Sequence, residues 1–153
     1  MHQIQRMIKL FTLKFFLLAS VLFLGLKSGA QKPVNWTEKQ IEEPANLANS
    51  ITEKKDIPVI INVGPGAIIP NSVDVGTVNS EEGLQKLKVR LKTIDKDEKI
   101  VIYCGCCPYE HCPNVRPAID ALKEMKFTNY YLLDLPNNIK KDWIDKGYPV
   151  SKI

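Results

Sequence analysis

Residues 99–116 read KIVIYCGCCPYEHCPNVR. Its first part, residues 99–103, is short, β-branched and apolar after the leading lysine, as expected of a strand buried on both faces of a parallel sheet. All four cysteines of the chain follow within the next positions, at Cys104, Cys106, Cys107 and Cys112. Asn114 can then cap a helix, because Pro117 becomes its third residue, where a missing N–H costs nothing. The stretch therefore predicts a strand, a cysteine-rich loop and a helix in direct succession.

The flanking sequence adds further strands and helices in alternation. Buried strands are predicted over residues 57–63 (IPVIINV) and 130–133, with a short edge strand near 73–75. Capping residues and the spacing of apolar side chains predict helices that begin near Thr37, at Pro44 and after Ser80, that run from Asn114 to about Lys126, and that span residues 139–146. This alternation predicts an α/β fold with a central, mostly parallel sheet and helices on both faces. In such sheets a site lies beyond the carboxyl ends of the strands, where the cysteine loop falls.

The first 30 residues predict a signal peptide. Arg6, Lys9 and Lys14 precede an apolar run over residues 15–26, and small residues at 28–30 precede Gln31. The apolar run is shorter than the ~20 residues of a membrane span, so we expect cleavage and no stable membrane association afterwards. The protein is then exported, to a periplasm or to the cell exterior. Residues 31–35 are expected to form a short disordered start, and residues 36–153 the domain.

Loss of residues 1–30 leaves the domain formally neutral. That segment contains Arg6, Lys9, Lys14 and Lys27 and no acidic residue, so the 21 basic residues of the chain fall to 17, equal to its 17 acidic residues. The net positive charge of the full chain therefore comes from the predicted signal peptide. A neutral domain predicts no nucleic-acid partner.

The cysteine loop has the features of a reactive thiol site. The thiolate is the nucleophilic form of cysteine, and both a helix N-terminus and a nearby guanidinium lower a thiol pKa. Arg116, in the first turn of the predicted helix, has the charge and fork geometry that suit a sulfur oxyanion. We expect Gly105, Asn114 and Val115 to belong to the anion-binding loop.

In these segments the chain resembles the rhodanese family, the single-domain proteins similar to thiosulfate sulfurtransferase. The resemblance covers about residues 36–150 and is carried by IVIYC at 100–104, by Arg116, by KFTNYYLL at 126–133 and by WIDKGYPV at 143–150. It implies that Cys104 is the nucleophile and carries a persulfide, which loop amides and Arg116 stabilise. It also implies an enzyme without a cofactor that takes sulfane sulfur from a small donor and delivers it to an acceptor thiol or cyanide. The loop is longer here than is usual in the family, and its additional thiols, Cys106, Cys107 and Cys112, are candidate relay or resolving groups.

Three other interpretations of the cysteine loop remain open. Cys104 and Cys107 form a C-x-x-C pair, which is compatible with thiol–disulfide redox chemistry. The four thiols, with His111, could instead bind a soft metal ion. A disulfide between Cys104 and Cys107, or between Cys107 and Cys112, would give a locked loop on a non-catalytic module in an oxidising compartment.

Overall fold

The apolar runs of the sequence form the centre of a five-stranded parallel sheet. The computed structural model describes residues 34–152, and the predicted signal peptide, residues 1–30, lies outside the described residues. The strands are β1 (Ile41–Glu42), β2 (Val59–Asn62), β3 (Val73–Asp74), β4 (Ile100–Tyr103) and β5 (Tyr130–Leu133). They lie in the order β1-β5-β4-β2-β3, and every neighbouring pair is parallel. The strand that leads into the cysteine loop, β4, is therefore the central one.

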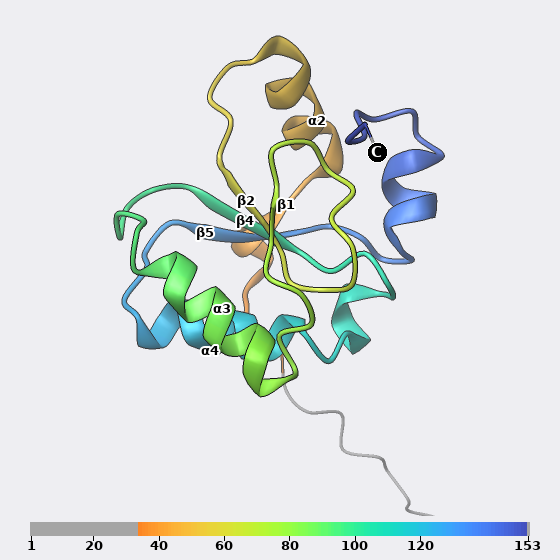
Figure 1. The fold of residues 1–153 in the computed structure, drawn as a ribbon. Helices are drawn as coiled ribbons and strands as arrows, with labels where there is room; N and C mark the ends of the chain where they lie inside the picture. Colours follow the sequence, from red (N-terminus) through yellow and green to blue (C-terminus); the bar gives the residue numbers. More distant parts are fainter. Residues whose placement is uncertain (1–33, 153) are drawn as a thin grey trace, which may run out of the picture. The chain divides into compact units, whose positions relative to one another are not determined.

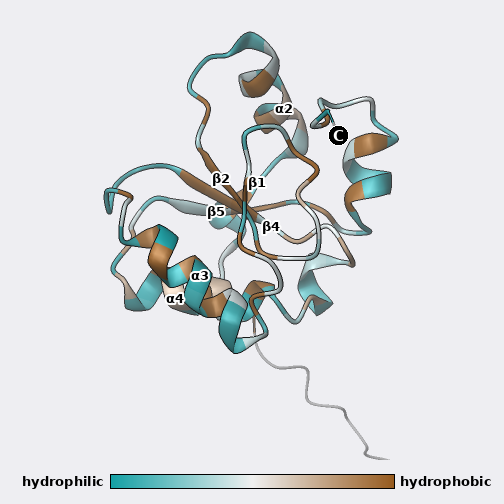
Figure 2. Cartoon of the chain, viewed as in Figure 1, coloured by the Kyte–Doolittle hydropathy of each residue, from teal (hydrophilic) through white to brown (hydrophobic). Residues whose placement is uncertain are grey.

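Helices cover both faces of this sheet, as predicted (Figure 1). On one face lie α3 (Glu81–Leu91) and α4 (Val115–Glu124), and on the other lie α2 (Pro44–Glu53) and a single π-helical turn, η3 (Lys140–Ile144). Side chains of β4 alternate between the two resulting cores. Ile100 and Ile102 pack with α3 and α4, whereas Val101 and Tyr103 pack with α2 and η3. All four are completely buried, and Figure 2 shows the hydrophobic residues gathered along the strands.

Helices α2, α3 and α4 begin where the capping residues and prolines of the sequence predict. Pro44 is the first residue of α2, and the hydroxyl of Ser80 accepts a hydrogen bond from the backbone N–H of Gly83 at 3.1 Å at the start of α3. Asn114 is the N-cap of α4, with Pro117 third in the helix. These starts confirm the predicted boundaries.

Two predicted helices are shorter in the structure. At Thr37 the backbone N–H donates to Gln40 Oε1 at 3.1 Å, but the helix that follows, η1 (Glu38–Gln40), has three residues of 3-10 type. It gives way to β1, a strand that the sequence analysis missed because two residues carry no periodic pattern. At the other end of the chain, the helix predicted over residues 139–146 is reduced to η3, and Gly147 adopts a left-handed conformation with φ 74° just beyond it.

The described residues contain no helix with both the length and the apolar character that crossing a bilayer requires. This finding applies to residues 34–152 and leaves the prediction for residues 1–30 as it stands.

Candidate functional site

The cysteine loop begins at the carboxyl end of β4. Parallel pairing carries β2 and β4 to the same edge of the sheet, where the N–H of Val63 donates to the carbonyl oxygen of Tyr103 at 2.9 Å. Cys104 follows immediately and is only 1% exposed. The loop then makes one short 3-10 turn, η2 (Tyr109–His111), before α4 begins. The sheet thus places the first cysteine at the edge where parallel α/β folds carry their sites.

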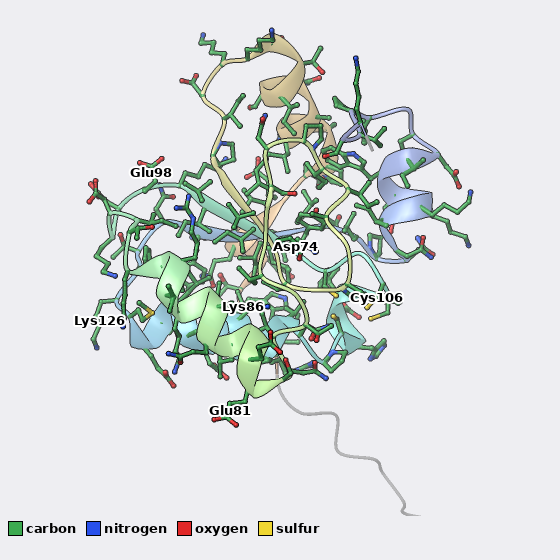
Figure 3. All side chains as sticks on the ribbon, viewed as in Figure 1. Asp74, Glu81, Lys86, Glu98, Cys106 and Lys126 are labelled. Carbon is green, nitrogen blue, oxygen red and sulfur yellow. The ribbon has the colours of Figure 1, made fainter. Side chains whose placement is uncertain are left out.

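Four free thiols gather in this loop, at different depths. Cys104 and Cys112 are buried, Cys107 is half-buried, and Cys106 is exposed. The Sγ of Cys106 lies 3.3 Å from that of Cys104 and 3.2 Å from that of Cys107. Figure 3 shows the sulfur atoms close to the labelled Cys106. A continuous line of sulfur contacts therefore runs from the buried Cys104 to the surface.

Hydrogen bonds make Cys104 the thiolate of the group. The pKa of Cys104 is lowered to about 5, chiefly by a hydrogen bond from the Cys112 thiol and further by the backbone N–H of Cys106 and the side chains of Asn114 and Cys106, which together outweigh burial. The pKa of Cys112 is raised, first because it donates to Cys104 and then by burial. The pKa of Cys106 is raised to about 12 by desolvation and by its hydrogen bonds with Cys107 and Cys104. Cys104 is thus ionised at neutral pH while its two neighbours keep their protons.

The Asn114 side chain hydrogen-bonds to two thiols and makes no capping hydrogen bond in its own helix. Its Nδ2 donates to Cys104 Sγ at 3.5 Å and to Cys112 Sγ at 3.8 Å, and its Oδ1 accepts from the backbone N–H of Asn79 at 3.0 Å. The side chain makes no capping hydrogen bond within α4. Asn114 therefore contacts both sulfur atoms through its side-chain amide, and its predicted part in binding an anion stays a prediction.

Gly64 and Asn62, which the sequence analysis did not assign to the site, form its opposite wall. A Cβ atom on Gly64 would lie 2.5 Å from Cys104 Sγ, so only glycine permits this approach of the loop after β2. Asn62 is fully buried, donates to the Gly64 carbonyl oxygen at 2.8 Å and to Asp74 Oδ1 at 3.0 Å, and accepts from the Gly64 N–H. The available signal was the buried polar residue Asn62 at the end of an apolar strand, followed two positions later by a glycine.

Gly105 and Val115 lie at the two ends of the loop. Gly105 is packed so closely that a Cβ would meet Ile139 Cβ at 2.8 Å, and its carbonyl oxygen accepts from the Ile139 N–H at 3.0 Å. Val115 is completely buried in the core with α3. Both residues fix the loop in place, and their predicted part in binding an anion stays a prediction.

Arg116 is half-buried and contacts η2 and Trp36. Its Nη1 donates to the carbonyl oxygen of Glu110 in η2 at 3.0 Å, and its guanidinium lies 5.4 Å from the centre of the Trp36 ring. Trp36 in turn packs edge-on against Tyr109. The hydrogen bonds that lower the pKa of Cys104 come from Cys112, Cys106 and Asn114. The predicted role of Arg116 as an anion ligand remains a prediction.

Three of the four thiols are close enough together to hold one metal ion. The Sγ atoms of Cys104, Cys106 and Cys112 all lie within 4.8 Å of one another. Cys107 and His111, which the sequence analysis also considered, are outside this group. Thiolate sulfur is the ligand type that soft ions prefer.

A groove of about 950 Å³ lies elsewhere, between β3 and α3, and is lined by residues such as Val73, Lys86 and Val89. None of its lining residues is a cysteine. The groove is therefore separate from the cysteine loop.

Comparison with known proteins supports the fold. The sequence matches no protein-family model and no curated protein. Among solved structures, it is similar to a protein from Bacillus halodurans, with 17% identity, a TM-score of 0.53 and coverage of 72% of this chain and 74% of that one. A protein from Lactobacillus plantarum gives 12% identity, a TM-score of 0.54 and coverage of 74% and 89%. The rhodanese-like domain of an Anabaena protein gives 14% identity, a TM-score of 0.53 and coverage of 74% and 80%. With its five parallel strands, its helices on both faces and its cysteine cluster beyond the central strand, the chain has a rhodanese-like fold.

Proposed function

We propose that the protein is an exported sulfurtransferase that carries sulfane sulfur as a persulfide on Cys104. The observation that carries this proposal is the position of the Cys104 sulfur, buried at the carboxyl end of the central strand and surrounded by hydrogen-bond donors from Asn114 and Cys112. Such donors stabilise a thiolate, which is the attacking form of sulfur. The proposal of export is based only on the signal peptide predicted for residues 1–30.

The proposed reaction has two steps. The Cys104 thiolate attacks the outer sulfur of a donor such as thiosulfate, the S–S bond of the donor breaks, and sulfite leaves with the electron pair of that bond. An acceptor nucleophile, a thiol or cyanide, then attacks the outer sulfur of the persulfide and restores the Cys104 thiolate. Arg116, which hydrogen-bonds to η2, is proposed to bind the anionic end of the donor.

Sulfur loading of the reduced protein tests this function. Protein from the expressed full-length chain is mixed with thiosulfate and examined by intact mass and by cyanolysis. We expect the protein to take one sulfur atom from the donor and to release one sulfite, and cyanide present from the start should trap that sulfur as thiocyanate. Cys104→Ser should abolish this transfer, whereas Cys107→Ser, whose sulfur contacts that of Cys106, is the matched control and should behave like the wild type. Equal loading of the Cys104→Ser protein would show that another cysteine is the nucleophile.

Soft-metal binding is the second candidate function, favoured by the proximity of three sulfur atoms. Elemental analysis of protein purified without chelators separates the two. A stoichiometric metal ion that is lost in both Cys104→Ser and Cys112→Ser proteins would favour a metal site.

A further inference from the structure

The Cys104 sulfur is closed in by the protein on several sides. Gly64 approaches so closely that a methyl group there would lie 2.5 Å from the sulfur, and Asn114 and Cys112 contact it from the start of α4. Cys104 as a whole residue is only 1% exposed. A large acceptor molecule therefore has little room to reach a sulfur atom attached to Cys104.

Cys106 is the exposed thiol that already contacts this sulfur. Its Sγ lies 3.3 Å from Cys104 Sγ, whereas a disulfide bond is about 2.05 Å long, so an approach of little more than about 1 Å joins the two. Gly105 between them is held by Ile139, which fixes the turn that brings the two sulfurs together. The loop thus carries an acceptor thiol of its own.

We propose that Cys106 is the resolving thiol of this site, so that a persulfide on Cys104 is discharged as hydrogen sulfide and leaves a Cys104–Cys106 disulfide. This inference rests on the proposed function. The Cys106 sulfur attacks the inner sulfur of the persulfide, the Cys104 S–S bond breaks, and the terminal sulfur leaves with its electron pair. The proton of the Cys106 thiol passes to that leaving sulfur. The sulfane sulfur is reduced by two electrons, and the two cysteines are oxidised by two electrons.

The other two thiols are less suited to this role. Cys112 is completely buried, so a disulfide formed there would be out of reach of the external dithiol that must reduce the site before another turnover. Cys107 Sγ contacts Cys106 at 3.2 Å, and no contact between Cys107 and Cys104 is seen among the described side chains. Cys107 therefore provides the matched control.

The test is a single turnover without external thiol. Reduced full-chain protein is given one equivalent of thiosulfate, and released sulfide, intact mass and the position of any cross-link are measured. We expect the wild-type protein to release one sulfide, to lose the mass of two hydrogen atoms and to contain a peptide linked between Cys104 and Cys106. Cys106→Ser should instead retain the added sulfur on Cys104 and release no sulfide until a small thiol is added. Cys107→Ser should release sulfide as the wild type does.

The outcomes separate this inference from the proposed function. If the wild-type and Cys106→Ser proteins both keep a stable added sulfur on Cys104, the sulfurtransferase stands and the resolving role of Cys106 is wrong. A cross-link to Cys112 would likewise overturn the assignment. If the Cys106→Ser protein gains no sulfur and the wild type releases no sulfide, the proposed function itself fails.

Discussion

At the scale of single residues, the reactivity of Cys104 depends on donors that come from the far end of its loop. Asn114, ten positions along the chain, donates its side-chain amide to the Cys104 sulfur, and Cys112 donates its thiol proton. The carbonyl of the same Asn114 amide is held by the backbone N–H of Asn79, which fixes the direction of its N–H groups. Hydrogen bonds to the charged form lower a pKa, so these residues keep Cys104 ionised although it is buried.

Replacing Cys112 by alanine should raise the pKa of Cys104 from about 5 towards its ordinary value of 9.0, because the largest stabilising hydrogen bond to the thiolate is lost. Between these two values the thiolate fraction of the variant should therefore be lower than that of the wild type. The ultraviolet absorbance of the thiolate, followed against pH in reduced protein, measures this shift. Cys107→Ala is the control and should leave the Cys104 transition unchanged. A Cys112→Ala protein that titrates like the wild type would contradict the assigned hydrogen bond.

At the scale of elements, the site is assembled where the segments after β2 and β4 meet. Asn62 at the end of β2 holds the backbone of Gly64 with two hydrogen bonds, and Gly64 packs against Cys104 beyond β4. The buried amide of Asn62 also reaches Asp74 in β3, so three adjacent strands contribute to this wall. Because the wall is backbone held by a network, it cannot easily move to admit a larger side chain.

Gly64→Ala tests this close packing against a matched glycine. A Cβ on Gly64 would lie 2.5 Å from Cys104 Sγ, and a Cβ on Gly83 in α3 would lie 2.2 Å from the Thr77 carbonyl oxygen, with no cysteine among its three nearest atoms. Overpacking should lower the free energy of unfolding of both variants, by about 1–3 kcal/mol. Only Gly64→Ala should slow sulfur loading as well, on the order of 100-fold, because the nucleophile is displaced. Urea unfolding and the loading rate check the two effects, and equal loading by both variants would argue against a tight wall at Cys104.

At the scale of the whole domain, the two hydrophobic cores hold β4 rigidly between them and leave the cysteine loop at one edge of the sheet. Tyr103 connects this edge to the segment after β2, because its hydroxyl group accepts from the N–H groups of Ile68 and Ile69 at 3.0 and 3.3 Å. The ionised Cys104 is therefore part of the folded structure and must influence its stability. A thiol whose pKa is lowered by folding stabilises the folded state where that thiol is ionised.

The contribution of Cys104 to stability should depend on pH in a defined direction. It is fully present above the pKa of an unfolded thiol, near 9.0, declines as the pH falls, and is lost below about 5. Cys106 and Cys112, whose pKa values are raised, act in the opposite sense above pH 9.0, where only the unfolded chain ionises them readily. Urea unfolding of reduced wild-type and Cys104→Ala proteins between pH 5 and 9.0 measures the effect. The stability difference between them should grow in favour of the wild type with rising pH, and a constant difference would count against an ionised Cys104.

The sequence by itself determined the order of the main elements and the place of the cysteine loop. Apolar β-branched runs predicted the buried strands, and Ser80, Asn114 and Pro117 predicted the helix starts, because caps and local periodicity are properties of neighbouring residues. Alternation of strands and helices then required a parallel sheet with the loop at its carboxyl edge. The two-residue strand β1 escaped prediction, since only its pairing with β5 defines it.

Only the tertiary structure decided what surrounds each sulfur. It brought Gly64 against Cys104, directed the Asn114 amide to two thiols, placed Cys106 rather than Cys107 in contact with Cys104, and laid Arg116 over Trp36. These contacts join residues from different segments, so they depend on how strands and helices pack and not on local preference. The identity of the thiolate followed from them, because a pKa is set by the groups within hydrogen-bond distance and by burial, which exist only once the chain has folded.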